Sequence, residues 1–159
     1  MQYSAAVITV SDRSSRGERA DASGPIAVAA LREAGFACED PIVIPDGADG
    51  VEAALRAALT DGIRIIVTTG GTGLGPRDET PEGTDRVLTR RVPGIAEELR
   101  RRASAAKPAG MLSRGVSGIA EAALIVNLPG SPKAVEEGMP VVLSVTTHVL
   151  EQLRGEDHG

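Results

Sequence analysis

Hydrophobic and polar residues alternate along the chain in blocks that predict strands and helices taking turns. Four short runs rich in branched or small apolar side chains predict strands at residues 4–10, about 41–45, 63–69 and 122–128. Residues 51–60 predict a helix whose apolar face carries Val51, Ala54, Leu55, Ala58 and Leu59. This alternation predicts a layered α/β fold, and because no linker divides residues 1–159 we expect one domain.

Prolines predict where several of the helices begin. Pro25, Pro81 and Pro132 follow a Gly, a Thr or a Ser and suit the first turn of a helix, where an N–H group has no intrahelical partner. The last helix is expected at roughly 140–153, with Val142, Val145, Val149 and Leu153 on one side. Residues 103–121 are the least regular stretch, and an excursion from the sheet is expected there.

Polar residues follow each predicted strand at its carboxyl end. Ser11-Asp12-Arg13 follow the first strand, Asp46 the second, a glycine-rich turn with Asp78 the third, and the segment from Asn127 to Ser131 the last. In an open parallel sheet, ligands bind in the crevice outside the carboxyl ends of the strands. The sequence therefore predicts that these segments line one cleft.

The glycine-rich turn is the most specific of these segments and has the sequence TTGGTGLGPRDETPEGT over residues 68–84. Gly70, Gly71, Gly73 and Gly75 lack a Cβ, so their N–H groups can approach phosphate oxygens closely. Neither the P-loop pattern nor the dinucleotide-binding pattern is present. The turn is interpreted as an anion site, although glycines after a strand can also serve only to reverse the chain.

Asp46 and Asp78 are the candidate ligands of a divalent cation. Both follow strands, so both are expected at the same edge of the sheet, where they could share one Mg²⁺ with substrate phosphates. Asp also favours turns for local reasons, so chance placement is the alternative.

Composition excludes some classes of function. The formal net charge is −5 and the aromatic residues are only Tyr3 and Phe36, which argues against nucleic-acid binding. No apolar run is long enough to cross a membrane and no leader pattern is present, so we expect no membrane partner and a cytoplasmic location. The single cysteine, Cys38, is interpreted as a structural thiol, and the run 100–102 of arginines as a solvated helix face.

Five sequence blocks carry a family resemblance that covers nearly the whole chain. They are Val10-Ser11-Asp12-Arg13 with Gly17, Asp21, Ser23 and Gly24; Pro45-Asp46; TTGGTG with Arg77-Asp78 and Thr80-Pro81-Glu82; Met111-Leu112-Ser113-Arg114; and Asn127-Leu128-Pro129-Gly130-Ser131-Pro132. In this order they resemble the MogA/MoaB family of molybdenum cofactor biosynthesis proteins, to which the G domains of gephyrin and of plant Cnx-type proteins are related.

The resemblance implies a three-layer molybdopterin-binding α/β fold, with a mostly parallel central sheet flanked by helices, that usually forms trimers. In catalytic members it implies adenylylation of molybdopterin by Mg-ATP with release of pyrophosphate. It implies a catalytic and Mg²⁺-binding role for Asp46 and Asp78. The residues it implies for nucleotide and phosphate binding are Gly70, Gly71, Thr72, Gly73 and Arg77. Those it implies for molybdopterin binding are Ser11, Asp12, Arg13, Ser113, Asn127, Pro129, Gly130, Ser131 and Lys133.

Two other functions stay open on the sequence. Some relatives keep the fold without known catalysis, so the chain could be a molybdopterin carrier that hands the pterin to a molybdate-inserting enzyme. A nucleotide-binding module of the competence-damage type is the third reading. Arg13, Arg77 and Lys133 are candidates for phosphate contacts, although each could equally be a surface charge.

Overall fold

The strands of the computed structural model, which describes residues 2–156, form one sheet in the order β2–β1–β4–β7–β6–β5, with β3 also paired to β1. They are β1 (Ser4–Val10), β2 (Ala37–Cys38), β3 (Ile42–Ile44), β4 (Ile65–Thr69), β5 (Arg90–Arg91), β6 (Ser117–Ala120) and β7 (Ala123–Leu128). The pairs among β1, β2, β3, β4 and β7 are parallel, while β6 runs antiparallel to β7 and β5 antiparallel to β6. The expected mostly parallel sheet is confirmed.

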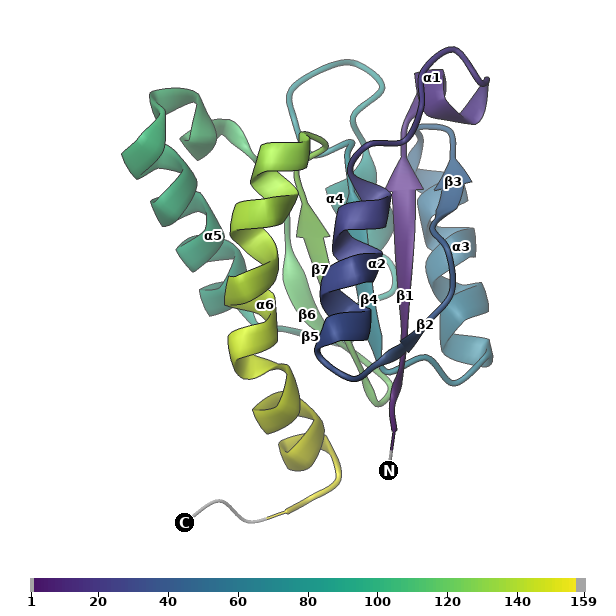
Figure 1. Cartoon of the computed structure of the whole chain (residues 1–159), viewed down its shortest axis with the longest axis vertical. Helices are drawn as coiled ribbons and strands as arrows, with labels where there is room; N and C mark the ends of the chain where they lie inside the picture. Colours follow the sequence, from purple (N-terminus) through teal and green to yellow (C-terminus); the bar gives the residue numbers. More distant parts are fainter. Residues whose placement is uncertain (1, 157–159) are drawn as a thin grey trace.

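Helices cover both faces of this sheet (Figure 1). They are α1 (Asp12–Ser15), α2 (Gly24–Glu33), α3 (Ala48–Thr60), α4 (Thr80–Asp85), α5 (Pro93–Ala106) and α6 (Pro132–Leu153), with a 3₁₀ helix η1 (Pro108–Leu112). On one face, Leu31 of α2, Ile95 of α5 and Met139 of α6 belong to the core cluster that includes Val67. On the other face, Leu55 of α3 packs with Ile66, the neighbour of Val67 in β4. Successive residues of a strand point to opposite faces, so the sheet is the middle of three layers.

Most of the predicted elements are confirmed with small shifts at their ends. The four predicted strands correspond to β1, β3, β4 and β7, and the helix predicted at 51–60 is the main part of α3. Pro25, Pro81 and Pro132 each lie in the first turn of a helix. Each of these elements is indicated by residues that are close together in the sequence, so the sequence alone could predict it.

The last helix differs from the prediction because α6 begins at Pro132 and continues through Pro140. A proline inside a helix removes a hydrogen bond and usually kinks or ends it. Here buried Met139 and Val142 continue the apolar face on both sides of Pro140. Packing against the sheet therefore keeps both halves in one helix.

The expected excursion from the sheet at residues 103–121 is only partly found. This stretch contains the end of α5 and η1, but its last part, β6, returns to the sheet beside β7. Ser117, Gly118, Ile119 and Ala120 are all buried. Short antiparallel strands of this kind depend on their partner more than on their own sequence pattern.

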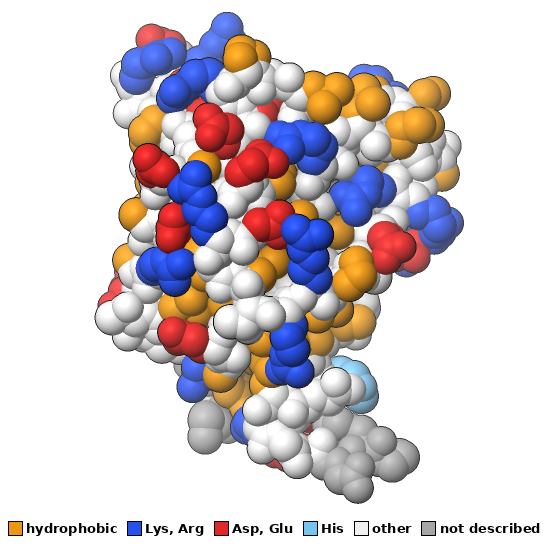
Figure 2. Space-filling view, turned by 180° about the vertical axis from the view of Figure 1, so that it is seen from behind, with side chains coloured by type: hydrophobic (Ala, Val, Ile, Leu, Met, Phe, Trp, Pro, Cys, Tyr) orange, Lys and Arg blue, Asp and Glu red, His pale blue; other side chains and the backbone are white. Residues whose placement is uncertain are grey.

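The surface seen from behind shows acidic and basic side chains side by side (Figure 2). Ion pairs link some of them around α3 and α4, including Arg86 with Asp49 at 2.7 Å and Arg56 with Glu52 at 2.9 Å. This face carries no continuous basic surface of the kind that nucleic acid requires. Among residues 2–156, no helix combines the length and the apolar character needed to cross a membrane.

Candidate active site

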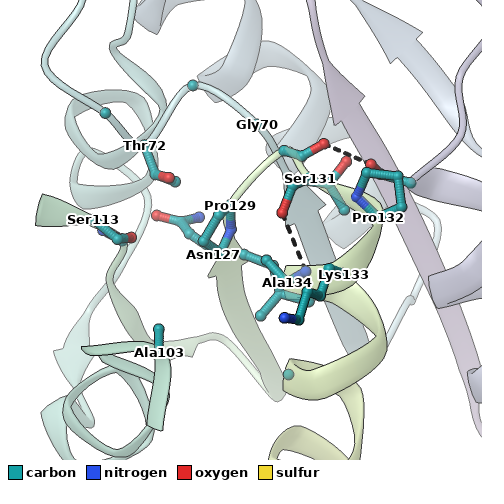
Figure 3. Close-up of a pocket in the computed structure, with 18 of the residues that line it drawn as sticks. Gly70, Thr72, Ala103, Ser113, Asn127, Pro129, Ser131, Pro132, Lys133 and Ala134 are labelled. Atoms are coloured by element: carbon teal, nitrogen blue, oxygen red, sulfur yellow. Dashed lines mark hydrogen bonds between the residues drawn. The ribbon is translucent and has the colours of Figure 1, made fainter. Parts of the chain in front are cut away.

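A cavity of about 1000 Å³ opens at the carboxyl edge of the sheet. It is lined by the segments that follow β1, β3, β4 and β7, together with residues of α5 and η1. In Figure 3, Ser113 lies on one side of the open space, and Ser131 and Lys133 lie on the other. The prediction that these strand ends line one cleft is confirmed.

The structure brings most of the predicted site residues together around this cavity. Those that line it are Ser11, Asp46, Gly70, Gly71, Thr72, Gly73, Asp78, Ser113, Asn127, Pro129, Gly130, Ser131 and Lys133. Three others, Asp12, Arg13 and Arg77, do not line it. Arg13 lies on α1 and is exposed.

The glycine turn after β4 packs tightly against its neighbours. Gly70 has a φ of 95°, and its N–H donates to the carbonyl of Leu128 at 3.0 Å. A Cβ at Gly70 would overlap the carbonyl of Val10, so a side chain has no room there. Gly71 has a φ of 68°, and a Cβ there would overlap the hydroxyl of Thr80. The sequence of the turn is thus set by both backbone conformation and space.

Asp46 and Asp78 approach this turn from two sides. A Cβ built on Gly71 would lie 3.2 Å from Oδ1 of Asp46. A Cβ built on Gly73 or Gly75 would lie 3.0 Å or 2.9 Å from Oδ2 of Asp78. The missing side chains leave the space in which the two carboxylates sit, and the N–H of Gly75 donates to Oδ2 of Asp78 at 2.9 Å.

Asp12 holds Asp46 through two reciprocal hydrogen bonds. The N–H of Asp12 donates to Oδ2 of Asp46 at 3.0 Å, and the N–H of Asp46 donates to Oδ1 of Asp12 at 3.1 Å. Burial raises the pKa of the Asp46 carboxyl, and the charges of Asp12 and Asp78 raise it further. Two negative charges near a half-buried carboxylate make a place that favours a cation.

Arg77 is bound to Asp12 and not aimed into the cavity. Its Nε and Nη2 each donate to one carboxylate oxygen of Asp12 at 3.0 Å, and Nη2 also donates to the main-chain carbonyl of Asp46 at 2.9 Å. This fork lowers the pKa of Asp12 and keeps it charged. In this structure Arg77 therefore contacts the segment that carries Asp46. The resemblance implied instead that Arg77 contacts a phosphate.

Asn127 is fixed inside the protein by a complete set of hydrogen bonds. Its Nδ2 donates to Oγ1 of Thr68 at 2.9 Å and to Oγ1 of Thr84 at 3.0 Å. Its Oδ1 accepts from the N–H of Val116 at 3.1 Å. Only 2% of Asn127 is exposed, so the side chain joins β4, β7 and α4 at the point where Asn127 borders the cavity.

The loop that follows Asn127 is held against the N-terminal part of the chain. The hydroxyl of Ser23 donates to the carbonyl of Gly130 at 2.6 Å. Ser131 caps α6, because its Oγ accepts from the N–H of Ala134 at 3.1 Å. The first turn of α6 thus lines the cavity, and the N-terminal end of a helix favours an anion.

Two arginines that the sequence did not assign to the site organise its far wall. Nη1 of Arg100 donates to the carbonyls of Ser113 and Gly115 at 3.3 Å and 2.7 Å. Arg114 donates to the carbonyls of Gly73 and Asp78 at 2.8 Å and 2.7 Å. The sequence predicts Arg100 on a solvated helix face, and it includes Arg114 only in a block that carries the family resemblance. No local signal marks such contacts, because their partners are 13 to 41 residues away.

Several positive side chains line the same cavity as the carboxylates. They are Arg19, Arg100, Arg102, Lys107 and Lys133. Among residues 2–156, no three His, Cys, Asp or Glu side chains gather closely enough to hold a metal ion by themselves. The site thus combines a carboxylate pair, a glycine turn and several cations in one cavity.

Comparison with known proteins gives the family. A family described as a probable molybdopterin binding domain matches residues 6–149. The chain belongs to this MogA/MoaB family of molybdopterin-binding domains. The structure of the Mog protein from Mycobacterium ulcerans is 42% identical, superimposes with a TM-score of 0.90, and is matched over 95% of this chain and 99% of that one.

Two curated relatives that differ in length match this chain. The molybdopterin adenylyltransferase of Haemophilus influenzae is 37% identical over 150 residues, which is 91% of this chain and 75% of that protein. The molybdenum cofactor biosynthesis bifunctional protein of Synechococcus elongatus is 37% identical over 155 residues, which is 98% of this chain. The chain spans about half, 49%, of that bifunctional relative.

Proposed function

We propose that the chain is a molybdopterin adenylyltransferase that uses Mg-ATP and releases pyrophosphate in molybdenum cofactor biosynthesis. The names of relatives 34–37% identical to the chain support a role in this biosynthesis. One observation carries the specific reaction: two carboxylates, Asp46 and Asp78, meet a glycine turn in a cavity that several cations also line. A carrier of molybdopterin alone needs no such carboxylate pair.

The residues present fit a magnesium ion that is shared with a nucleotide. Mg²⁺ in phosphate-transfer sites is usually held by one or two carboxylates and by substrate phosphates, and it keeps several waters. Asp46 and Asp78 supply the carboxylates. Burial raises the pKa of Asp46, and the charges of Asp12 and Asp78, which raise it further, are charges that a cation would offset. Since no larger ligand cluster exists among the described residues, the remaining ligands would come from the nucleotide and water. When bound, the ion would neutralise charge on the phosphate oxygens.

The chemical step we propose is an in-line displacement. The terminal phosphate oxygen of molybdopterin forms a bond to the α-phosphorus of ATP, and the bond from that phosphorus to the bridging oxygen of pyrophosphate breaks. Pyrophosphate leaves with the electron pair of the broken bond. The protein adds no covalent chemistry here, because its contribution is to align two polyanions and to neutralise their repulsion.

We expect several groups on the protein to bind the phosphates. The Oγ1 of Thr69 is buried, lines the cavity, and has no hydrogen-bond partner among residues 2–156. A buried hydroxyl of this kind costs free energy unless a ligand or water satisfies it. We assign Thr69, Thr72 and the N–H groups of Gly71 and Gly73 to the nucleotide phosphates.

We assign the two walls that carry Ser113 and Ser131 to the pterin substrate. Ser113, the N-terminus of α6 at Ser131, and Lys133 face the same cavity. Lys133 has only a loose ion pair, 3.9 Å to Glu137, and is exposed, so its ammonium group can turn to a phosphate. The phosphate end of molybdopterin would then lie between the two walls, within reach of the nucleotide.

The assembly and partners stay predictions. We keep the homotrimer, the cytoplasmic location and the transfer of the product to a molybdate-inserting enzyme as expectations from the family resemblance. Analytical ultracentrifugation of the purified chain tests the trimer directly. A single monomeric species at micromolar concentration would contradict it.

The experiment that tests the function separates an enzyme from a carrier. Purified protein is incubated with freshly released molybdopterin and ATP, with and without Mg²⁺, and adenylylated product and pyrophosphate are both measured. We expect equal amounts of the two products, and only with Mg²⁺. Molybdopterin binding without either product would overturn the proposed enzyme and would favour the carrier.

A further inference from the structure

Each of the two carboxylate residues in the candidate site has its main-chain carbonyl held by an arginine. Nη2 of Arg77 donates to the carbonyl of Asp46 at 2.9 Å, and Nη2 of Arg114 donates to the carbonyl of Asp78 at 2.7 Å. Neither arginine lines the cavity. Their role therefore differs from that of a cation that contacts the substrate.

Arg114 holds the loop that carries Asp78 at several points. Its N–H donates to the carbonyl of Thr72 at 2.8 Å, and its Nε donates to the carbonyl of Gly73 at 2.8 Å. Its Nη1 donates to Glu82 of α4 at 2.7 Å, which orients the guanidinium from the other side. One side chain thus connects the start of the loop, its end and the helix that follows.

The loop needs such an external support because little else fixes it. Residues 74–77, between Gly73 and Asp78, are exposed. Two of them are Gly75 and Pro76, which offer few side-chain contacts. The internal bonds are the pair between Gly75 and Asp78, at 3.0 Å and 2.9 Å. Without Arg114, the position of the Asp78 carboxylate would depend on this short turn and on the contacts of Arg77.

Arg77 supports the other carboxylate through Asp12. Its guanidinium donates hydrogen bonds to both carboxylate oxygens of Asp12, and Asp12 in turn exchanges two hydrogen bonds with Asp46. Arg77 directly precedes Asp78 in the chain, so the same contact also ties the loop of one carboxylate to the segment of the other. Arginine contacts outside the cavity therefore hold both segments that carry the carboxylates.

We propose that Arg77 and Arg114 are positioning residues that fix the two carboxylates at the separation needed to share one metal ion with the nucleotide. This inference rests on the proposed function and extends it to residues that do not touch substrate. Residues behind metal ligands commonly change metal affinity or activity by about 10–100-fold when they are replaced. A lysine in either position keeps the charge but cannot form the two-pronged contact.

The test measures how strongly metal and nucleotide binding are coupled. The affinity of the protein for α,β-methylene-ATP, which cannot be cleaved at the reacting bond, is measured by calorimetry with and without Mn²⁺ as a substitute for Mg²⁺. The contribution of the metal is the ratio of the dissociation constant without metal to the dissociation constant with metal. We expect Arg114→Lys and Arg77→Lys to lower this ratio by about 10-fold or more, with the affinity in the absence of metal unchanged.

Arg56→Lys is the matched control. Arg56 also donates to a carboxylate, Glu52 at 2.9 Å, and to a main-chain carbonyl, that of Arg86 at 3.1 Å. Like Arg77 and Arg114 it does not line the cavity, but these two partners lie outside the cavity as well. We expect its ratio to equal that of the wild type. If Arg114→Lys does not fold, Glu82→Ala decides, because it leaves Arg114 in place and removes only its orienting carboxylate.

The outcomes separate this inference from the proposed function. If the wild type shows metal coupling and the Arg77, Arg114 and Glu82 variants all keep it, the positioning role is overturned while the proposed reaction stands. Equal losses of affinity with and without metal would also overturn it, since they indicate a general structural role. If the wild type shows no metal coupling, the metal assignment and this inference fall together.

Discussion

Replacing Asn127 with Ala tests whether this residue is an internal anchor or a contact to the pterin. The structure gives its side chain three hydrogen bonds, two donated to Thr68 and Thr84 and one accepted from Val116. At about 1 kcal/mol for each bond, the free energy of unfolding should fall by about 3 kcal/mol. In a protein of this size that corresponds to a melting temperature lower by about 6–12 °C.

The assay is urea unfolding followed by circular dichroism, with Ser23→Ala as the matched control. Ser23 is also buried and loses a single bond, to the carbonyl of Gly130, so its variant should lose only about 1 kcal/mol. The slope of the unfolding curve should not change, because the folded structure is otherwise retained. If Asn127→Ala unfolds like the wild type but no longer binds molybdopterin, the anchor interpretation is wrong.

Three further predictions concern the turn, the metal site and the thiol. Gly71→Ala should lose about 2–4 kcal/mol in urea unfolding, because the residue needs a positive φ and its Cβ would overlap Thr80; wild-type stability would show that the turn is not constrained. Metal-dependent nucleotide binding should weaken as the pH falls through the pKa of Asp46, which is raised above the ordinary value of 3.8, because the protonated carboxyl is a poor ligand; binding unchanged down to about pH 4 would contradict this. Burial raises the pKa of Cys38, so iodoacetamide at pH 8 should alkylate it more slowly than a free cysteine; an equal rate by mass spectrometry would contradict it.

The sequence predicted those parts of the fold that depend on neighbouring residues. The run of Ile65, Ile66 and Val67 is buried on both faces and reads as a strand without knowledge of its partners. By contrast, the last helix was predicted at roughly 140–153, yet α6 begins at Pro132 and continues through Pro140 because its buried face packs on the sheet. A local rule loses to tertiary packing when enough apolar surface is buried on both sides.

The same division holds for the candidate site. Asp46 and Asp78 could be found because parallel strands bring their carboxyl ends to one edge, and that rule needs only the order of strands. The contacts of Arg77 could not be found, since its sequence gives no reason to prefer Asp12 over a phosphate. Arg114 was missed for the same reason, because it acts on the loop from a different segment of the chain.

The central claim is that the carboxylate pair makes this cavity an adenylyl-transfer site. It is tested most directly by ATP labelled at the α-phosphate, incubated with molybdopterin and Mg²⁺, with Asp46→Asn and Asp78→Asn beside the wild type. Asp49→Asn is the matched control, because Asp49 is an exposed aspartate whose side chain pairs with Arg86 outside the cavity.

We predict transfer of the label to molybdopterin by the wild type and by Asp49→Asn. In each of the two site variants the rate should fall by about 10²–10³-fold, since metal stabilisation of phosphoryl charge contributes several kcal/mol. Circular dichroism should show that both variants stay folded. Label transfer at the wild-type rate in both Asp46→Asn and Asp78→Asn would contradict the account.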